Sequence, residues 1–401
     1  MTHKQIVNTQ ISEILSKASE FSELTDKEVL SLGNYSEDHI DELCRAASSI
    51  RDYGKGRTVT FSPKVFIPLT RLCRDYCGYC TFRVDPDQTE NLYMSPEEVL
   101  NVARAGEILG CTEALFTLGE RPELKYAEAK KWLSIHGYDS TLDYLSAMTE
   151  LVVKETKLLP HANPGTMTHR ELNTLKDSNP STGLMLESTS ELLYQVGGPH
   201  EFAPSKRPIV RLKTISIAGE LRIPFTTGLL IGIGETMADR MESLLEIRNL
   251  QRRFNHIQEI IIQNFRAKPE TPMAEFPDAE TTEMLWTVAA ARLILGPSAN
   301  IQVPPNLSSE NYEVYLKAGI NDWGGVSPLT IDYVNPEAPW PLITNLKSKT
   351  ESAGFELRPR LVVYPEYFLD TDEYLPLHLL TKVRELADDE GYVKEGIDRY
   401  V

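Results

Sequence analysis

The chain has 401 residues, which suits two average domains or one large α/β barrel with appendages. Its 41 basic and 58 acidic residues give a formal net charge of −17, which disfavours binding to a nucleic-acid backbone. No apolar run approaches the roughly 18 residues of a membrane span, and residues 1–20 lack the apolar stretch of a signal peptide. We therefore expect a cytoplasmic protein that binds neither nucleic acid nor membrane.

Residues 1–60 are polar with helical spacing and predict an N-terminal helical extension. From residue 64, short apolar runs alternate with helical stretches, which predicts a parallel sheet. These runs are KVFIPLT (64–70), EALFTLG (113–119), LLPHANP (158–164), TGLMLES (182–188), PFTTGLLIGIG (224–234), HIQEIIIQNF (256–265), NIQVPPNL (300–307) and NDWGGVSP (321–328). Eight such units predict an α/β fold, a (β/α)₈ TIM-type barrel over residues 61–335, with an open parallel sheet as the alternative. Residues 336–401 predict a C-terminal appendage, a helix and a strand that pack on the barrel.

The ends of these runs carry polar or glycine-rich segments, among them TRLCRDYCGYC, TLGERPE, HANPG and QNFRAK. In a barrel, the carboxyl ends of the strands meet at one face, where active sites lie. The repetition of polar ends along the chain therefore predicts a functional site at that face.

Cys73, Cys77 and Cys80 follow the first run directly, with the spacing C-x₃-C-x₂-C. Thiolates bind iron–sulfur clusters, zinc or Cu(I), and a structural zinc site usually has four ligands. No fourth ligand lies nearby in the sequence, and Cys111 precedes the second run, at the opposite end of the barrel. Three thiolates leave one metal position open, as in a catalytic cluster. The alternatives are zinc with a distant fourth ligand and three buried cysteines on one helix face.

This motif, with an aromatic residue before its last cysteine, resembles the signature of the radical S-adenosylmethionine (SAM) superfamily. The resemblance implies that Cys73, Cys77 and Cys80 hold one 4Fe–4S cluster whose fourth iron is open to SAM. Reductive cleavage of SAM would give a 5′-deoxyadenosyl radical that takes hydrogen from a substrate. The electron would come from a low-potential donor such as a ferredoxin or flavodoxin.

Blocks between residues 60 and 365 narrow the resemblance, notably FSPKVFIPLTRLCRDYCGYCTF (61–82), PFTTGLLIGIGET (224–236) and DWGGVSP (322–328). They resemble the cyclising subunit 1 family of 7,8-didemethyl-8-hydroxy-5-deazariboflavin (FO) synthases. This implies a lyase that forms the deazaflavin chromophore of coenzyme F420. Its substrate would be an adduct of tyrosine and 5-amino-6-ribitylaminouracil, supplied by subunit 2, and ammonia would be lost.

Two alternatives stay open beside this function. The first is another radical SAM barrel, such as the tyrosine–uracil coupling subunit or a menaquinone- or biotin-pathway relative. The second, from a different class, is a non-catalytic iron–sulfur or zinc module.

The resemblance also assigns SAM contacts at the strand ends. Gly119 and Glu120 stand where the superfamily has Gly-Gly-Glu, although Leu118 replaces the first glycine. The whole expected set is Tyr79, Gly119, Glu120, Glu187, Ser188, Gly228, Gly232 and Glu235. The structural alternatives are a core aromatic for Tyr79, tight packing for the strand-five glycines, and helix capping for Glu120 and Glu235.

A substrate with a uracil, a ribityl chain and a phenol needs polar partners. Candidates at strand ends are His161, Asn163, Gln263, Asn264, Arg266, Asn306 and Asp322, with Lys268 nearby. His161 is the one histidine at a predicted strand end, and it is therefore the best general-base candidate. The alternative is that His161 only forms a hydrogen bond with the backbone.

Overall fold

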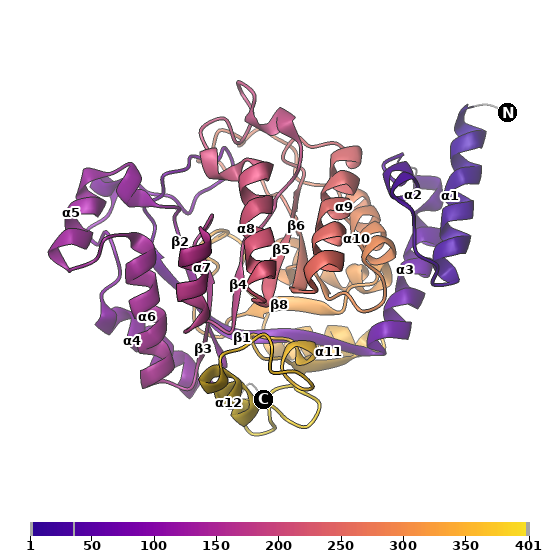
Figure 1. The fold of residues 1–401 in the computed structure, drawn as a ribbon. Coiled ribbons are helices and arrows are strands. Elements are labelled where there is room, and N and C mark those ends of the chain that lie inside the picture. The colour runs from indigo at the N-terminus through magenta and orange to yellow at the C-terminus, as the bar shows by residue number, and fades with distance from the viewer. Residues whose placement is uncertain (1–2, 35–36, 398–401) are drawn as a thin grey trace.

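The computed structural model describes residues 3–34 and 37–397, and in these ranges eight parallel strands close into a barrel (Figure 1). The strands are β1 (Thr58–Thr70), β2 (Glu113–Leu118), β3 (Leu159–Asn163), β4 (Ser181–Gly183), β5 (Phe225–Ile231), β6 (Ile257–Asn264), β7 (Ile301–Gln302) and β8 (Asp322–Val326). Each pairs with the next along the chain, and β1 pairs with both β2 and β8. The predicted barrel is therefore confirmed, and the open-sheet alternative is wrong.

The first strand has 13 residues, more than any other, and it joins three neighbours. Its end, from Lys64 to Thr70, pairs with β2. Its middle, from Thr60 to Pro63, pairs with β8. Its start pairs with a ninth parallel strand, β9 (Glu356–Pro359), which lies outside the ring. β1 therefore closes the barrel and also anchors the C-terminal part of the chain.

Helices lie around the barrel. They are α1 (His3–Ser19), α2 (Asp26–Ser31), α3 (Ile40–Lys55), α4 (Pro96–Ile108), α5 (Ala127–Ile135), α6 (Thr141–Glu155), α7 (His169–Lys176), α8 (Pro208–Glu220), α9 (Met237–Phe254), α10 (Thr281–Leu295), α11 (Ile343–Ser352) and α12 (Leu377–Leu386). Some of them, α1 and α2 among them, pack on other helices rather than on the strands. No helix in the described ranges is long and apolar enough to cross a membrane.

Helix α10 shows how the N-terminal helices join the fold. Its sequence, TTEMLWTVAAARLIL, is apolar on nearly all sides, which is typical of a helix covered on both faces. Strand β6 lies on its inner side and α3 packs on another side. The indole nitrogen of Trp286 donates to the carbonyl of Leu32, which ties α10 to the segment after α2. Figure 1 shows α1 to α3 beside α9 and α10.

Residues 360–364, which we call the C-terminal strap, cross the amino-terminal end of the barrel. The Arg360 amide donates to the carbonyl of Phe61 at 2.8 Å, beside the start of β1. The carbonyl of Val362 accepts from Ser181 on β4 and from Gln258 on β6, both at 3.1 Å. The strap therefore spans strands on opposite sides of the barrel and closes that end. The yellow C-terminal segment with α12 lies below the strands in Figure 1.

Candidate active site

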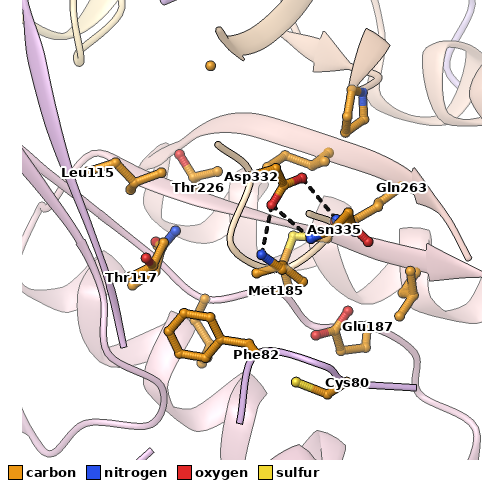
Figure 2. Close-up of a pocket in the computed structure, with 18 of the residues that line it drawn as sticks. Cys80, Phe82, Leu115, Thr117, Met185, Glu187, Thr226, Gln263, Asp332 and Asn335 are labelled. Carbon is orange, nitrogen blue, oxygen red and sulfur yellow. Dashed lines mark hydrogen bonds between the residues drawn. The ribbon is translucent and has the colours of Figure 1, made fainter. Parts of the chain in front are cut away.

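A cavity of about 370 Å³ occupies the barrel interior. Along β1, β2 and β6, alternate residues line it, as the two-residue repeat of a strand requires. In each of these strands the first lining residue is charged and the second is apolar: Lys64 then Phe66, Glu113 then Leu115, and Glu259 then Ile261. In Figure 2, Leu115 and Thr226 lie toward one side of the cavity, and Cys80, Phe82 and Glu187 lie toward the other. The cavity thus has a charged end, an apolar middle and an end that carries cysteines.

The three motif cysteines line that last end together. Their loop, which follows β1, is fixed by segments distant in the sequence. The Gly78 amide donates to the carbonyl of Pro199 at 2.8 Å, and Tyr76 forms an antiparallel bridge with Phe202. The carboxylate of Asp75 accepts a hydrogen bond from the Ser205 hydroxyl. The loop is therefore held in one conformation by residues 199–205.

Gly119 allows the end of β2 to pack directly against this loop. A β-carbon at Gly119 would lie 1.9 Å from the carbonyl oxygen of Leu72 and 2.7 Å from the β-carbon of Cys73. The next amide, of Glu120, donates to the sulfur of Cys73 at 3.2 Å. In the opposite direction, the Arg74 amide donates a hydrogen bond to the carbonyl of Glu120 at 2.7 Å. This close approach requires glycine, so the structure gives Gly119 a physical role.

The cysteine set fits a cluster better than a single metal ion. Burial raises the pKa of the Cys73 thiol to about 12, so this group is protonated at neutral pH unless a metal replaces its proton. Within the described ranges, no three His, Cys, Asp or Glu side chains gather closely enough to hold one ion. In a 4Fe–4S cluster each thiolate binds a separate iron, so the sulfurs stand farther apart. The spacing of the three cysteines is therefore compatible with the cluster that the sequence motif implies.

Glu187, beyond β4, lies at the same end of the cavity with two cations beside it. Its φ of +66° places it in the left-handed region, and its carbonyl accepts from Leu230 of β5 at 3.1 Å. The Lys206 ammonium donates to its carboxylate, and a guanidinium nitrogen of Arg211 lies 3.9 Å away. Lys206 and Arg211 both line the cavity. The end of the cavity that carries the cysteines therefore offers groups that can bind the carboxylate and the ammonium of an amino acid.

Tyr79 and Glu120, two of the expected SAM contacts, also line the cavity. The Tyr79 hydroxyl lies 3.0 Å from Nε2 of His200, and burial, with Lys206 and Arg211 nearby, lowers the pKa of His200 to about 2. His200 is therefore neutral, and its Nε2 shares a hydrogen bond with the tyrosine hydroxyl. The carboxylate of Glu120 accepts from the amide and hydroxyl of Thr166 at 2.9 and 2.6 Å.

The other expected SAM residues lie outside the cavity lining. Ser188 is 2% exposed and its hydroxyl accepts from the Ser190 amide, while Gly228 lies within β5 against the backbone of β6. Glu235 accepts from the amides of Gly232 and Ile233 at 2.8 and 2.9 Å, and from Arg240 at 2.7 Å. Glu235 thus stabilises the loop after β5, whereas the cap of α9 is Thr236.

His161 and Asn163, on β3, project into the cavity as a connected pair. Nδ1 of His161 lies 2.6 Å from the Ser181 hydroxyl, and Nε2 lies 3.0 Å from Oδ1 of Asn163. Burial lowers the pKa of His161 to about 4, so the ring is neutral at pH 7. Its partners are side chains and not the backbone, which leaves His161 available for proton transfer if the pair rearranges.

The expected residues at the end of β6 and just beyond it all reach the cavity. Gln263, Asn264 and Arg266 line the cavity, and so does Lys268. Asn264 and Arg266 donate to the carbonyl of Leu307 at 3.1 and 3.2 Å, and Lys268 donates to that of Val334 at 3.0 Å. These residues therefore connect β6 to the loops after β7 and β8.

Two expected substrate residues are corrected by the structure. Asp322 is the first residue of β8, not its end, because the strand covers Asp322–Val326. It is 0% exposed and is paired with Arg360 of the strap at 2.7 Å. Asn306 is buried and donates to Asp332 at 3.0 Å, and its side chain does not line the cavity. Asp332 takes the place of Asn306 in the lining, with Asn335 bonded to it (Figure 2).

Several residues that line the cavity were not predicted from the sequence. Glu113 and Glu259 stand early in their strands and Lys64 stands in the middle of β1, whereas the predicted site lies at the strand ends. A charged residue inside an otherwise apolar run was the available signal. Lys206 and Arg211 lie between β4 and β5 and had no motif to mark them.

The fold and the site define a radical SAM enzyme. The family model described as the radical SAM superfamily matches residues 67–247. Among solved structures, the chain is similar in fold to the FeFe-hydrogenase maturase HydG from Carboxydothermus hydrogenoformans. The TM-score is 0.69 at 20% identity, over 99% of this chain and 95% of that one.

Closer relatives identify the family. The chain is 52% identical over 336 residues to the 7,8-didemethyl-8-hydroxy-5-deazariboflavin synthase of Methanopyrus kandleri, covering 84% of this chain and 100% of that protein. It is 51% identical over 368 residues to the FO synthase of Streptomyces coelicolor, covering 89% of this chain but 42% of that protein. The chain thus spans less than half the length of the Streptomyces relative. It belongs to the FO synthase family of radical SAM enzymes.

Proposed function

We propose that the chain is the cyclising lyase of deazaflavin formation. Its substrate would be the adduct of tyrosine and 5-amino-6-ribitylaminouracil, and its products the tricyclic deazaflavin and ammonia. The observation that carries this proposal is a cavity with three cysteines at one end, an apolar middle, and a charged end that the strap closes. Such an enclosed space would protect a radical from water and still bind a polar substrate.

The cysteines would hold the cluster, which supplies an electron to SAM and so a radical able to remove a hydrogen atom from the substrate. Lys206 and Arg211 would bind the carboxylate of SAM, because a carboxylate prefers paired cations in a buried site. Tyr79 would lie against the adenine, on the wall that His200 supports. His161 would take up and release a proton during loss of ammonia, once its contact with Asn163 has opened.

We also propose two partners for this reaction. The adduct would come from a second FO synthase module, subunit 2. We propose this partner because some relatives are more than twice as long as the region that matches this chain, and so have room for a second module. Electrons would come from a ferredoxin or flavodoxin, because cluster potentials suited to SAM reduction lie at the low end of the roughly −700 to +450 mV range.

The test uses the chain reconstituted with iron and sulfide without oxygen, then given dithionite, SAM and the adduct. Formation of both 5′-deoxyadenosine and fluorescent deazaflavin is expected. Replacement of the three motif cysteines by alanine should remove the brown colour and both products. The matched controls Cys44→Ala and Cys111→Ala change buried cysteines away from the cavity and should keep the colour. If 5′-deoxyadenosine forms without deazaflavin, the proposed substrate is wrong. If a chain with a full cluster forms neither product, the proposed activity is wrong.

A further inference from the structure

The end of the cavity opposite the cysteines is built from charged and polar side chains, and we call it the cavity floor. Every member lines the cavity and is less than 9% exposed: Lys64, Glu113, Thr226, Glu259, Gln302 and Arg360. Five of them come from five different strands and the sixth from the strap. Barrel interiors at this depth are usually filled by branched apolar residues. Because buried charge is costly, this floor needs a reason beyond filling space.

The charges of the floor are paired with one another. Lys64 lies 2.7 Å from Glu113, and Arg360 lies 2.6 Å from Glu259 and 2.7 Å from Asp322 beneath it. Two cations thus face three carboxylates, and the floor carries no net positive charge even if one carboxylate is protonated. An anionic ligand such as a phosphate is therefore disfavoured there. A neutral ligand with both donors and acceptors fits these groups.

Two glycines of β8 give the floor its space. A β-carbon at Gly325 would lie 2.3 Å from Cε of Lys64, and one at Gly324 would lie 1.9 Å from Nε2 of Gln302. In the described part of the chain, no protein group forms a hydrogen bond with the Gln302 side-chain amide, although this residue is 6% exposed. The amide therefore borders the cavity without a protein partner among the described residues. The cavity is the side from which a ligand can supply one.

We propose that the floor binds a neutral, acyclic polyol chain, and this rests on the proposed function, whose substrate carries a ribityl chain. The floor groups surround the cavity from several strands, and a narrow chain with hydroxyls on its different sides can bond to all of them. A flat ring would present its faces to charged groups and use few of them. The apolar middle of the cavity, with Phe66, Leu115 and Ile261, suits the rings instead. The ribityl chain would then point away from the cysteines.

The test compares three adducts: the ribityl adduct, an analogue with methyl in place of ribityl, and the ribityl adduct phosphorylated at its chain terminus. For the unsubstituted enzyme we expect kcat/KM to fall about 30-fold or more for the methyl analogue, mainly through KM, since several hydrogen bonds to charged groups are lost. We expect the phosphorylated adduct to bind about 10-fold or more weakly than the ribityl adduct. Equal turnover of the methyl analogue, or tighter binding of the phosphorylated adduct, would overturn the proposal.

Gln302→Leu tests the floor with little change of volume or charge. It should lower kcat/KM about 10-fold for the ribityl adduct and less than about 3-fold for the methyl analogue. Gln10→Leu, a matched change on helix α1 where Gln10 donates to Ser31, should alter neither. An equal loss on both adducts in Gln302→Leu would indicate a structural role and refute the proposal.

Calorimetric binding separates this inference from the proposed function. If no deazaflavin forms, the proposed function fails, but binding to the reconstituted enzyme can still be measured. If binding depends on the ribityl chain of the adduct and Gln302→Leu removes that dependence, the result would support a polyol site in an enzyme of different chemistry. Equal affinity for adducts with and without the ribityl chain would refute the proposal for the cavity floor, whether or not deazaflavin forms.

Discussion

Replacing Gly119 by alanine should separate cluster binding from folding. The added β-carbon would stand 1.9 Å from the Leu72 carbonyl oxygen, and about 1.1 Å of further separation is needed to reach 3.0 Å. The obstacle is backbone and cannot turn away, so the cysteine loop must move, and Cys73 moves with it because its own β-carbon lies 2.7 Å from the new atom. Overpacking of this kind costs about 1–3 kcal/mol. If that strain acts on the loop, cluster affinity falls roughly 5- to 150-fold.

The assay is iron content and visible absorbance after anaerobic reconstitution, together with unfolding by urea. Gly106→Ala is the matched control: its β-carbon would lie 2.4 Å from Cγ1 of Val65, where α4 packs on the outside of β1. Both variants should lose stability, but only Gly119→Ala should lose iron while folded. A folded Gly119→Ala protein with normal iron content and normal SAM cleavage would refute the reasoning.

Three further predictions concern buried polar groups. His161→Ala and Asn163→Ala should each abolish deazaflavin formation but keep SAM cleavage, and normal product yield in both would mean that the substrate lies elsewhere. His256 is buried with a pKa lowered to about 4 from 6.5, so the folded state binds fewer protons and stability should rise with pH between these values. Urea unfolding of His256→Gln should show a slope smaller by up to about 1.4 kcal/mol per pH unit, and an unchanged slope would contradict the shift. Arg360→Met should lower the free energy of unfolding by about 3–5 kcal/mol, because Asp322 stays buried and uncompensated, and Asp322→Asn in the same chain should restore part of it.

The sequence predicted the barrel well because strand–helix alternation is a local signal. All eight apolar runs overlap a strand, including the two-residue β7. The cysteine motif was equally visible, since its spacing lies within one loop. Glu187 was predicted as a site residue at the end of the fourth strand, but β4 ends at Gly183 and Glu187 lies beyond it. Its ion pair with Lys206 could not be predicted, because the two residues meet only after folding.

The main error in the predicted site concerned the position of residues along the barrel axis. Asp322 was assigned to the carboxyl end of its strand, because the sequence does not show where the short β8 begins. Its partner, Arg360, lies 38 residues later and could not be paired with it from the sequence. The floor residues were missed for the same reason, since their charges are matched by groups on other strands.

The strap has a consequence for how the protein is made. Arg360 emerges from the ribosome only after all eight barrel strands, and until then Glu259 and Asp322 lack their common cation. At about 5–20 residues per second, the chain from β1 to the strap takes roughly 15–60 seconds to synthesise. The barrel therefore cannot gain its full stability strand by strand during translation. A nascent chain stalled before residue 360 should therefore lack the strap across the amino-terminal end of its barrel and be less stable than the full chain.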